Sequence, residues 1–267
     1  MMQFSANLGF LWTEHSLIKA IHAAKAAGFQ AVECHWPYET PAEEVLVALQ
    51  ETGLKMIGIN TQRGNIQVGE NGLAALLGRE TDARQFIDEA IEYARIIDCK
   101  NIHVMAGFTN RCEASQKIFA NNIQYACVAA SKHKMTILIE PLNARDAPGY
   151  HLTTLEQAQA VLREVAEPNL KIMFDCYHMQ IMGGDLLRRF TNALDDIGHV
   201  QFASVPDRSE PNLGEINYSW LLSALTKAGY DGVFGAEYKP QGKTGESIDW
   251  MKKFSKKSIG LALSEEN

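Results

Sequence analysis

The stretch Lys171–His178, KIMFDCYH, is an apolar run that ends in a carboxylate, an aromatic ring and an imidazole. Such a run predicts a strand buried on both faces, as in a parallel sheet covered by helices. Three further runs follow the same plan: TILIEPLN (136–143) with Glu140, HVQFASVPDR (199–208) with Gln201, and GVFGAEYKP (232–240) with Glu237. Together with Asp175, they place four oxygen-bearing side chains at corresponding strand ends, which predicts one shared site.

The 267-residue chain contains eight apolar runs expected as strands, and each is followed by a segment with helical periodicity. The expected strands are 3–8, 31–36, 55–60, 101–107, 135–142, 170–176, 199–205 and 233–238. The expected helices are 14–27, 41–52, 80–98, 116–132, 155–165, 185–194, 218–228 and 248–263. A barrel of eight βα units needs about 250 residues. We therefore predict an α/β fold, a single (β/α)8 TIM barrel over residues 1–267.

An open, doubly wound parallel sheet is the alternative architecture. Such sheets usually carry a glycine-rich phosphate-binding turn after the first strand, but here that strand is followed by GFLWTEH (9–15). The sequence also contains no P-loop motif. Both absences favour the barrel.

Residues 61–78 interrupt the alternation, because they contain four glycines and no strong periodicity. Long loops in compact domains are uncommon and often functional. In a barrel, a loop that follows a strand lies on the C-terminal face, where active sites are found. We interpret the segment as a lid or pocket wall, and a disordered insertion is the alternative.

The composition narrows the class of protein. Hydrophobic residues make up 46% of the chain, enough for a large core, and the formal net charge of −7 argues against a nucleic-acid partner. Five cysteines without a CxxC pair favour reduced thiols and a cytoplasmic location over a disulfide framework. The N-terminus lacks a basic segment and no apolar run approaches about 20 residues, so we expect no signal peptide and no membrane partner. A homo-oligomer is left open.

Glu140, Asp175, Gln201 and Glu237 are the candidate metal ligands. Three ionised carboxylates would repel one another, at about 3 kcal/mol for each pair at ~5 Å and an effective dielectric of ~20. A cation among them relieves this repulsion, and hard oxygen ligands suit Mg²⁺ or Mn²⁺ better than structural zinc. The alternative is that the four side chains are unrelated, solvated strand ends.

Glu140 and Glu237 are also the candidate catalytic residues. They come from the fifth and eighth strands and can approach a small substrate from opposite sides. One carboxylate would remove a proton next to a carbonyl group while the other manages a proton on the far side. The sequence does not decide which glutamate abstracts the proton.

Three further residues are candidates for substrate binding. His178 could hydrogen-bond a substrate oxygen, or it could cap the next turn. Arg208 could pair with a substrate carboxylate through two hydrogen bonds, or it could be a surface arginine. Lys239 is a weaker candidate cation. His103 in the fourth strand could face the barrel interior, but we interpret it as a buried structural histidine.

The motifs IEPLN (139–143), FDCYHMQ (174–180), HVQFASVPDRSEPNLGEINY (199–218) and GAEYKP (235–240) resemble the hydroxypyruvate isomerase family of the xylose-isomerase-like TIM barrels. The segments at 4–14 and 60–80 resemble the same family. The resemblance implies a (β/α)8 barrel, a divalent metal on Glu140, Asp175, Gln201 and Glu237, and the two glutamates as the proton-transfer pair. Related sugar epimerases usually have histidine where Gln201 stands, so Gln201 favours the hydroxypyruvate branch.

The resemblance implies interconversion of hydroxypyruvate and tartronate semialdehyde, with 2-oxo-tetronate, one carbon longer, as the substrate of a related subgroup. Both substrates are acids and would need Arg208 or a lid cation, Arg63 or Arg79. The alternatives are a 3-epimerase of free ketoses, a phosphodiesterase similar to AP-site repair enzymes, and a sugar-acid binder without catalysis. A repair enzyme would need a richer set of zinc ligands and a DNA-binding face.

Overall fold

The computed structural model describes residues 2–254, which form a closed barrel of eight parallel strands in sequential order. The strands are β1 (Phe4–Asn7), β2 (Ala31–Cys34), β3 (Lys55–Asn60), β4 (Asn101–His103), β5 (Thr136–Ile139), β6 (Leu170–Asp175), β7 (Ile197–Phe202) and β8 (Phe234–Ala236). The barrel closes where β1 pairs with β8, with Phe4 opposite Phe234. The predicted (β/α)8 architecture is confirmed.

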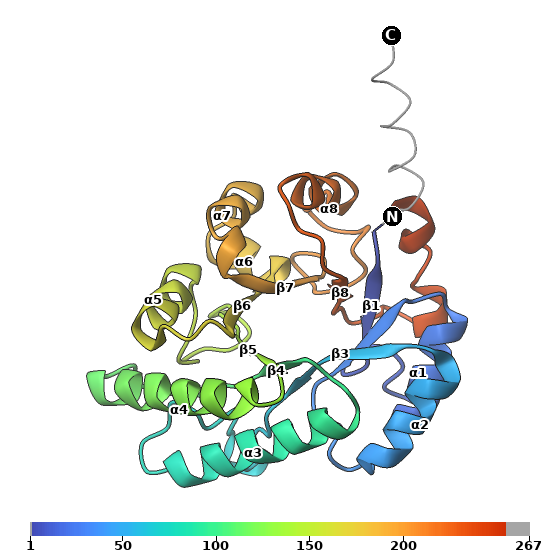
Figure 1. Ribbon diagram of the computed structural model, residues 1–267. Coiled ribbons are helices and arrows are strands. Elements are labelled where there is room, and N and C mark those ends of the chain that lie inside the picture. The colour runs from blue at the N-terminus through green and yellow to red at the C-terminus, as the bar shows by residue number, and fades with distance from the viewer. Residues whose placement is uncertain (1, 255–267) are drawn as a thin grey trace.

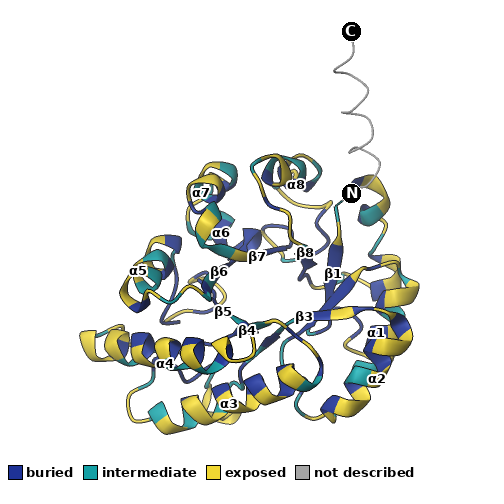
Figure 2. Ribbon diagram, viewed as in Figure 1, coloured by how far each residue is buried: buried dark blue, intermediate teal, exposed yellow. Residues whose placement is uncertain are grey.

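The helices surround the barrel and bury one face each against it (Figure 1, Figure 2). They are α1 (Leu17–Ala26), α2 (Ala42–Thr52), α3 (Glu80–Ile96), α4 (Glu113–Ser131), α5 (Leu155–Val165), α6 (Cys176–Met182), α7 (Leu186–Asn192) and α8 (Tyr218–Lys227). Because both faces of each strand are covered, the strands read as nearly continuous apolar runs. No helix within residues 2–254 combines the length and the apolar character that crossing a membrane requires.

One helix was not predicted from the sequence. We expected the sixth strand to reach Cys176 and the next helix to begin at Asp185, but α6 starts at Cys176 directly after β6. The Asp175 side chain accepts a hydrogen bond from the Tyr177 backbone N–H at 2.7 Å, so the residue that ends β6 also caps α6. No turn residue separates the two elements, and the apolar pattern therefore gives no sign of the change.

The fourth strand is shorter than the predicted range 101–107. The Val104 N–H still donates to the Leu138 carbonyl of β5, but side-chain oxygens then replace the neighbouring strand as acceptors. Thr61 Oγ1 accepts from the Met105 N–H at 3.1 Å, and Tyr150 Oη accepts from the Ala106 N–H at 2.9 Å. The last predicted helix, 248–263, is helical over residues 250–254. Residues 248 and 249 are not helical, and residues 255–263 lie outside the described residues.

The segment 61–78 has a defined structure, which disagrees with the alternative of a disordered insertion. It contains a short 3₁₀ helix, η1 (Ile66–Val68), and Gly72 forms an antiparallel bridge with Ala106. A Cβ atom at Gly72 would lie 2.6 Å from the Met105 carbonyl carbon, so this close approach requires glycine. The segment is therefore fixed to the C-terminal side of β4.

Trp250 anchors the C-terminal part of the described chain to the barrel. It is 1% exposed, and its ring makes edge-to-face contacts with Phe4 at 5.1 Å and Phe202 at 5.3 Å between centroids. Its indole N–H donates to Tyr238 Oη at 3.2 Å. Burial of a tryptophan with a satisfied N–H contributes substantially to the stability of a core.

Trp250→Ala should lower the free energy of unfolding by about 3–5 kcal/mol, because it removes the largest fully buried side chain of this cluster. Trp220→Ala is the matched control: Trp220 is 58% exposed, and its loss should change stability by no more than about 0.5 kcal/mol. Urea unfolding measured by circular dichroism compares the two. Similar losses in both variants would contradict the assigned burial.

Candidate active site

The four predicted metal ligands meet at the C-terminal mouth of the barrel. Asp175 is the last residue of β6 and is the direct register partner of Gln201 on β7. Glu140 and Glu237 each follow their strand by one residue, after β5 and β8. All four side chains are buried. The structure therefore brings the predicted set together, as the strand spacing led us to expect.

Glu237 is surrounded by hydrogen-bond donors. Its Oε1 accepts from Asn7 Nδ2 and lies in hydrogen-bond contact with His35 Nε2, both at 2.8 Å, and accepts more weakly from Gln201 Nε2 at 3.3 Å. Its Oε2 accepts from the guanidinium of Arg208. Burial alone would raise the pKa of Glu237, but the charge of Arg208 and the contact with His35 lower it to about 2. Glu237 is therefore held ionised.

Glu140 has the opposite environment. Its Oε1 is buried and has no hydrogen-bond partner in the described chain. Burial, followed by the charges of Glu237 and Asp175, raises the pKa of Glu140 well above its ordinary value of 4.5. Its closest basic groups within the described residues are imidazoles, with His103 Nδ1 at 3.6 Å and His178 Nε2 at 3.9 Å. This environment therefore favours the neutral form of Glu140 more than an exposed position would.

His178 presents a hydrogen-bond donor to the site. Its Nδ1 accepts from the Asn143 backbone N–H at 3.0 Å and from Asn143 Nδ2 at 2.7 Å. The amide of Asn143 is fixed in turn, because its oxygen accepts from the Asp146 N–H. The ring proton must therefore sit on Nε2, and burial together with Arg208 lowers the pKa of His178 well below 6.5. The neutral ring directs its Nε2–H toward Glu140 and Asp175.

Arg208 lies inside the site rather than on the surface. Its guanidinium contacts Asp175 Oδ2 at 3.4 Å as well as Glu237, and packs against the rings of Phe10 and Tyr177 at 4.8 and 5.0 Å. Its backbone adopts a left-handed conformation with φ of +52°. Lys239, the other predicted cation, is exposed, and its Nζ lies 6.0 Å from the Phe10 ring, at the rim.

A cavity of ≈ 200 Å³ opens above these groups. Its lining includes Glu140, Glu237, His178, Arg208 and His103, together with Phe10, Trp36, Asn60, Asn71, Met105 and Asp146. We interpreted His103 from sequence as a structural histidine; it is buried in β4, but both ring nitrogens lack hydrogen-bond partners in the described chain and it faces this cavity. Asn71 comes from the segment 61–78, which therefore supplies part of the pocket wall.

The donor set fits a divalent cation. Buried oxygen atoms without a hydrogen-bond partner in the described chain are present on Glu140 and Gln201, and both are acceptors that a cation would satisfy. Ligand atoms of Glu140, Asp175 and His178 also lie within 4.8 Å of one another. Since His178 Nε2 carries the proton in this hydrogen-bond network, the oxygen set with Gln201 fits better than one that includes this nitrogen.

Several residues around the site were not predicted from the sequence. Asn7 and His35, at the ends of the first two strands, fix Glu237. Glu33 and His199 lie deeper in the barrel and contact each other at 3.1 Å. The signal was present, because Glu33 is a lone carboxylate within the buried strand AVEC, but the predicted site was confined to strands five to eight.

Comparison with known proteins defines the family. The family model described as xylose isomerase-like TIM barrel matches residues 21–254. The chain belongs to this family. A 2-oxo-tetronate isomerase of Cupriavidus necator is 42% identical over 95% of this chain and 99% of its own length. A hydroxypyruvate isomerase of Escherichia coli is 39% identical over 94% and 98%.

A crystal structure described as AP endonuclease, family 2, from Brucella melitensis superposes with a TM-score of 0.92 at 38% identity, covering 95% of this chain and 99% of that one. The near-complete coverage confirms the expected barrel. The named isomerases confirm the enzyme class predicted from the sequence, an isomerase similar to hydroxypyruvate isomerases.

The opposite environments of the two glutamates predict opposite effects on stability. Glu140→Gln should stabilise the metal-free protein at neutral pH, because ionising this carboxyl costs more in the folded than in the unfolded state; the gain should vanish below pH 4.5. Glu237→Gln should destabilise the protein by on the order of 2–3 kcal/mol, because its ionised form is stabilised by folding. This contribution is present above its unfolded pKa and is lost as the pH falls toward 2.

Urea unfolding of both variants after treatment with EDTA, at pH 5 and pH 7.5, tests this. Glu164→Gln, on an exposed position of α5, is the control and should leave stability unchanged. Shifts of the same sign for Glu140→Gln and Glu237→Gln would contradict the opposite directions of their pKa shifts.

Proposed function

We propose that this isomerase acts on a small 2-oxo acid and interconverts hydroxypyruvate with tartronate semialdehyde, assisted by a divalent metal ion. The observation that carries the proposal is the pair of glutamates at one cavity, of which Glu237 is surrounded by hydrogen-bond donors and Glu140 Oε1 has no partner in the described chain. Groups whose environments push their pKa values apart are suited to act as an acid and a base. The 2-oxo-tetronate isomerase and hydroxypyruvate isomerase relatives support the substrate class.

The reaction moves one hydrogen between neighbouring carbons. The Glu237 carboxylate takes a proton from the hydroxymethyl carbon, and the electron pair forms the double bond of an enediolate. The protonated Glu237 then returns this proton to the former carbonyl carbon, while the Glu140 carboxylate accepts the hydroxyl proton from the terminal oxygen and delivers it to the neighbouring oxygen. At the end both glutamates are ionised, as they were at the start, and the same steps in reverse order convert the aldehyde back.

Negative charge develops on the oxygen atoms of the substrate during the reaction, and hydrogen-bond donors stabilise it. His178 supplies a fixed Nε2–H, because Asn143 holds the other ring nitrogen as an acceptor. A divalent cation bound by Glu140, Asp175, Gln201 and Glu237, Mg²⁺ or Mn²⁺, would add positive charge beside the enediolate oxygens. The guanidinium of Arg208 contacts Asp175 and Glu237 and would also face the enediolate oxygens.

The cavity favours a small acid over a larger sugar. Its ≈ 200 Å³ is below the about 300–1,000 Å³ of sites for drug-sized ligands. Arg63 at its edge lies over the Trp36 ring at 4.6 Å and donates to Asn71 Oδ1 at 2.9 Å, and both partners line the cavity. Arg79, the other lid cation, is bound to Glu70 and Asp82. Arg63 is therefore our candidate for the substrate carboxylate.

Glu140→Gln and Glu237→Gln should each lower kcat for hydroxypyruvate by about 10²–10⁴, the usual contribution of an acid–base group. The assay follows tartronate semialdehyde formation by proteins stripped with EDTA and reloaded with Mg²⁺ or Mn²⁺. Glu164→Gln is the control and should keep full activity. Full activity in either site variant would remove that glutamate from the mechanism, and equal activity of the stripped enzyme would exclude a role for metal.

Arg63→Gln should raise KM for hydroxypyruvate about 10-fold with little change in kcat, because a charge-assisted hydrogen bond contributes about 1.5–3 kcal/mol. Arg79→Gln, in the same segment, is the matched control and should leave KM unchanged. A neutral three-carbon ketose should show no dependence on Arg63. An unchanged KM in Arg63→Gln would assign the carboxylate to another cation.

The same assays separate the alternatives. Preference for 2-oxo-tetronate over hydroxypyruvate would place the chain with the Cupriavidus necator relative. Preference for free ketoses would indicate a 3-epimerase, and binding without turnover a sugar-acid binder. Nicking of abasic duplex DNA would support the endonuclease activity after which the Brucella melitensis protein is named, although residues 2–254 offer one cluster of three histidine or carboxylate ligands rather than several.

A further inference from the structure

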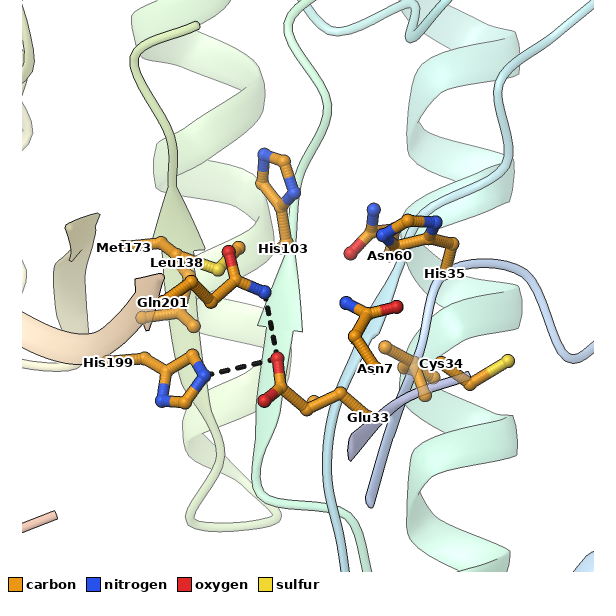
Figure 3. A pocket seen from close by; sticks show the side chains of 12 residues that line it. Asn7, Glu33, Cys34, His35, Asn60, His103, Leu138, Met173, His199 and Gln201 are labelled. Carbon is orange, nitrogen blue, oxygen red and sulfur yellow. Dashed lines mark hydrogen bonds and ion pairs between the residues drawn. The ribbon is translucent and has the colours of Figure 1, made fainter. Parts of the chain in front are cut away.

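A second group of buried polar side chains surrounds the carboxylate of Glu33, next to the proposed metal ligand Gln201. Glu33 on β2 is 3% exposed, and its carboxylate accepts from Ser5 Oγ and from Gln201 Nε2, the latter at 2.8 Å. His199 Nε2 lies 3.1 Å from the same carboxylate oxygen. Figure 3 shows both Gln201 and His199 directed at Glu33 across the barrel. Glu33 does not line the active-site cavity of ≈ 200 Å³, so the proposed acid–base chemistry leaves it without a role.

The contacts of Gln201 fix which way its amide faces. Its nitrogen lies between two carboxylates and donates to Glu33 Oε2 at 2.8 Å and to Glu237 Oε1 at 3.3 Å. Its oxygen is buried and has no hydrogen-bond partner in the described chain. A rotation of the amide by 180° would place that oxygen against two carboxylates and lose both hydrogen bonds. Only one orientation is therefore favourable.

This orientation matters because the two ends of an amide differ as ligands. The oxygen carries lone pairs that a hard cation binds, whereas the nitrogen offers only N–H donors. Partners of a ligand outside the coordination sphere commonly fix its orientation. Glu237 contributes a longer contact and is itself a candidate ligand, which leaves Glu33 as the main group that holds the amide.

We propose that Glu33 is a positioning residue that fixes the Gln201 amide with its oxygen toward the divalent metal. The inference rests on the proposed function, because it takes Gln201 as a ligand. The orientation of Gln201 on β7 would thus depend on Glu33 on β2, which reaches it across the interior of the barrel.

The surrounding packing is built for this contact. Gly235 on β8 is the register partner of Gln201. A Cβ atom there would lie 2.9 Å from both Gln201 Cγ and His199 Nε2 and would collide with Glu33. The absence of a side chain at Gly235 therefore leaves the space in which the three groups meet.

The test is the affinity of the protein for Mn²⁺, measured by calorimetry on protein stripped with EDTA. Glu33→Gln keeps the size of the side chain but replaces an acceptor by a group that can also donate, so either orientation of Gln201 becomes acceptable. We expect the affinity to fall about 10–100-fold, the usual effect of losing such a partner. Glu210→Gln, at another buried glutamate, is the control for loss of a buried charge and should change the affinity less than about 3-fold.

A double-mutant cycle distinguishes positioning from a general structural role. In a Gln201→Ala background, Glu33→Gln should reduce the Mn²⁺ affinity by less than about 2-fold further, because the side chain it orients is gone. Additive losses, or wild-type affinity in Glu33→Gln alone, would overturn the inference and leave the proposed function intact. Failure of the wild-type protein to bind Mn²⁺ or Mg²⁺ would instead overturn the metal-assisted function itself.

Discussion

The burial of carboxylates at the barrel mouth is the constraint on which the rest of the site depends. Glu140, Asp175 and Glu237 lie within one cluster, and ionised carboxylates at ~5 Å repel by about 3 kcal/mol for each pair. Arg208 neutralises one charge. Three carboxylates and one guanidinium leave two negative charges, which one divalent cation would balance. Burial raises the pKa of Asp175 to about 7, so the site opposes a negative charge that no cation compensates.

The hydrogen-bond donors of the site are distributed unequally between its two glutamates. Asn7, His35 and Arg208 all serve Glu237, whereas Oε1 of Glu140 receives no hydrogen bond from the described chain. The donors come from β1, from the end of β2 and from the loop after β7, so the ionised glutamate is fixed by several elements of the barrel at once. A symmetric arrangement would not distinguish the two carboxyls, whereas different environments suit them to different roles in proton transfer.

The sequence predicted the barrel and the placement of Glu140, Asp175, Gln201 and Glu237, because one apolar run after another ends in an oxygen ligand and parallel strands share a common C-terminal face. It could not predict the state of each group. The neutral tautomer of His178 depends on Asn143, and the location of Arg208 inside the site depends on a left-handed backbone. The helix α6 was missed because Asp175 ends a strand and caps a helix without an intervening turn.

The contact between Glu33 and Gln201 could not be predicted from the order of residues along the chain. The two residues are 168 positions apart and lie on β2 and β7, which are not hydrogen-bonded neighbours in the barrel. Their contact spans the barrel interior and depends on the missing side chain of Gly235. An amide ligand has two nearly isosteric orientations, whereas a carboxylate presents the same oxygen atoms either way. In this chain Glu33 is the acceptor that would fix the Gln201 amide, and the same carboxylate oxygen lies 3.1 Å from His199 Nε2.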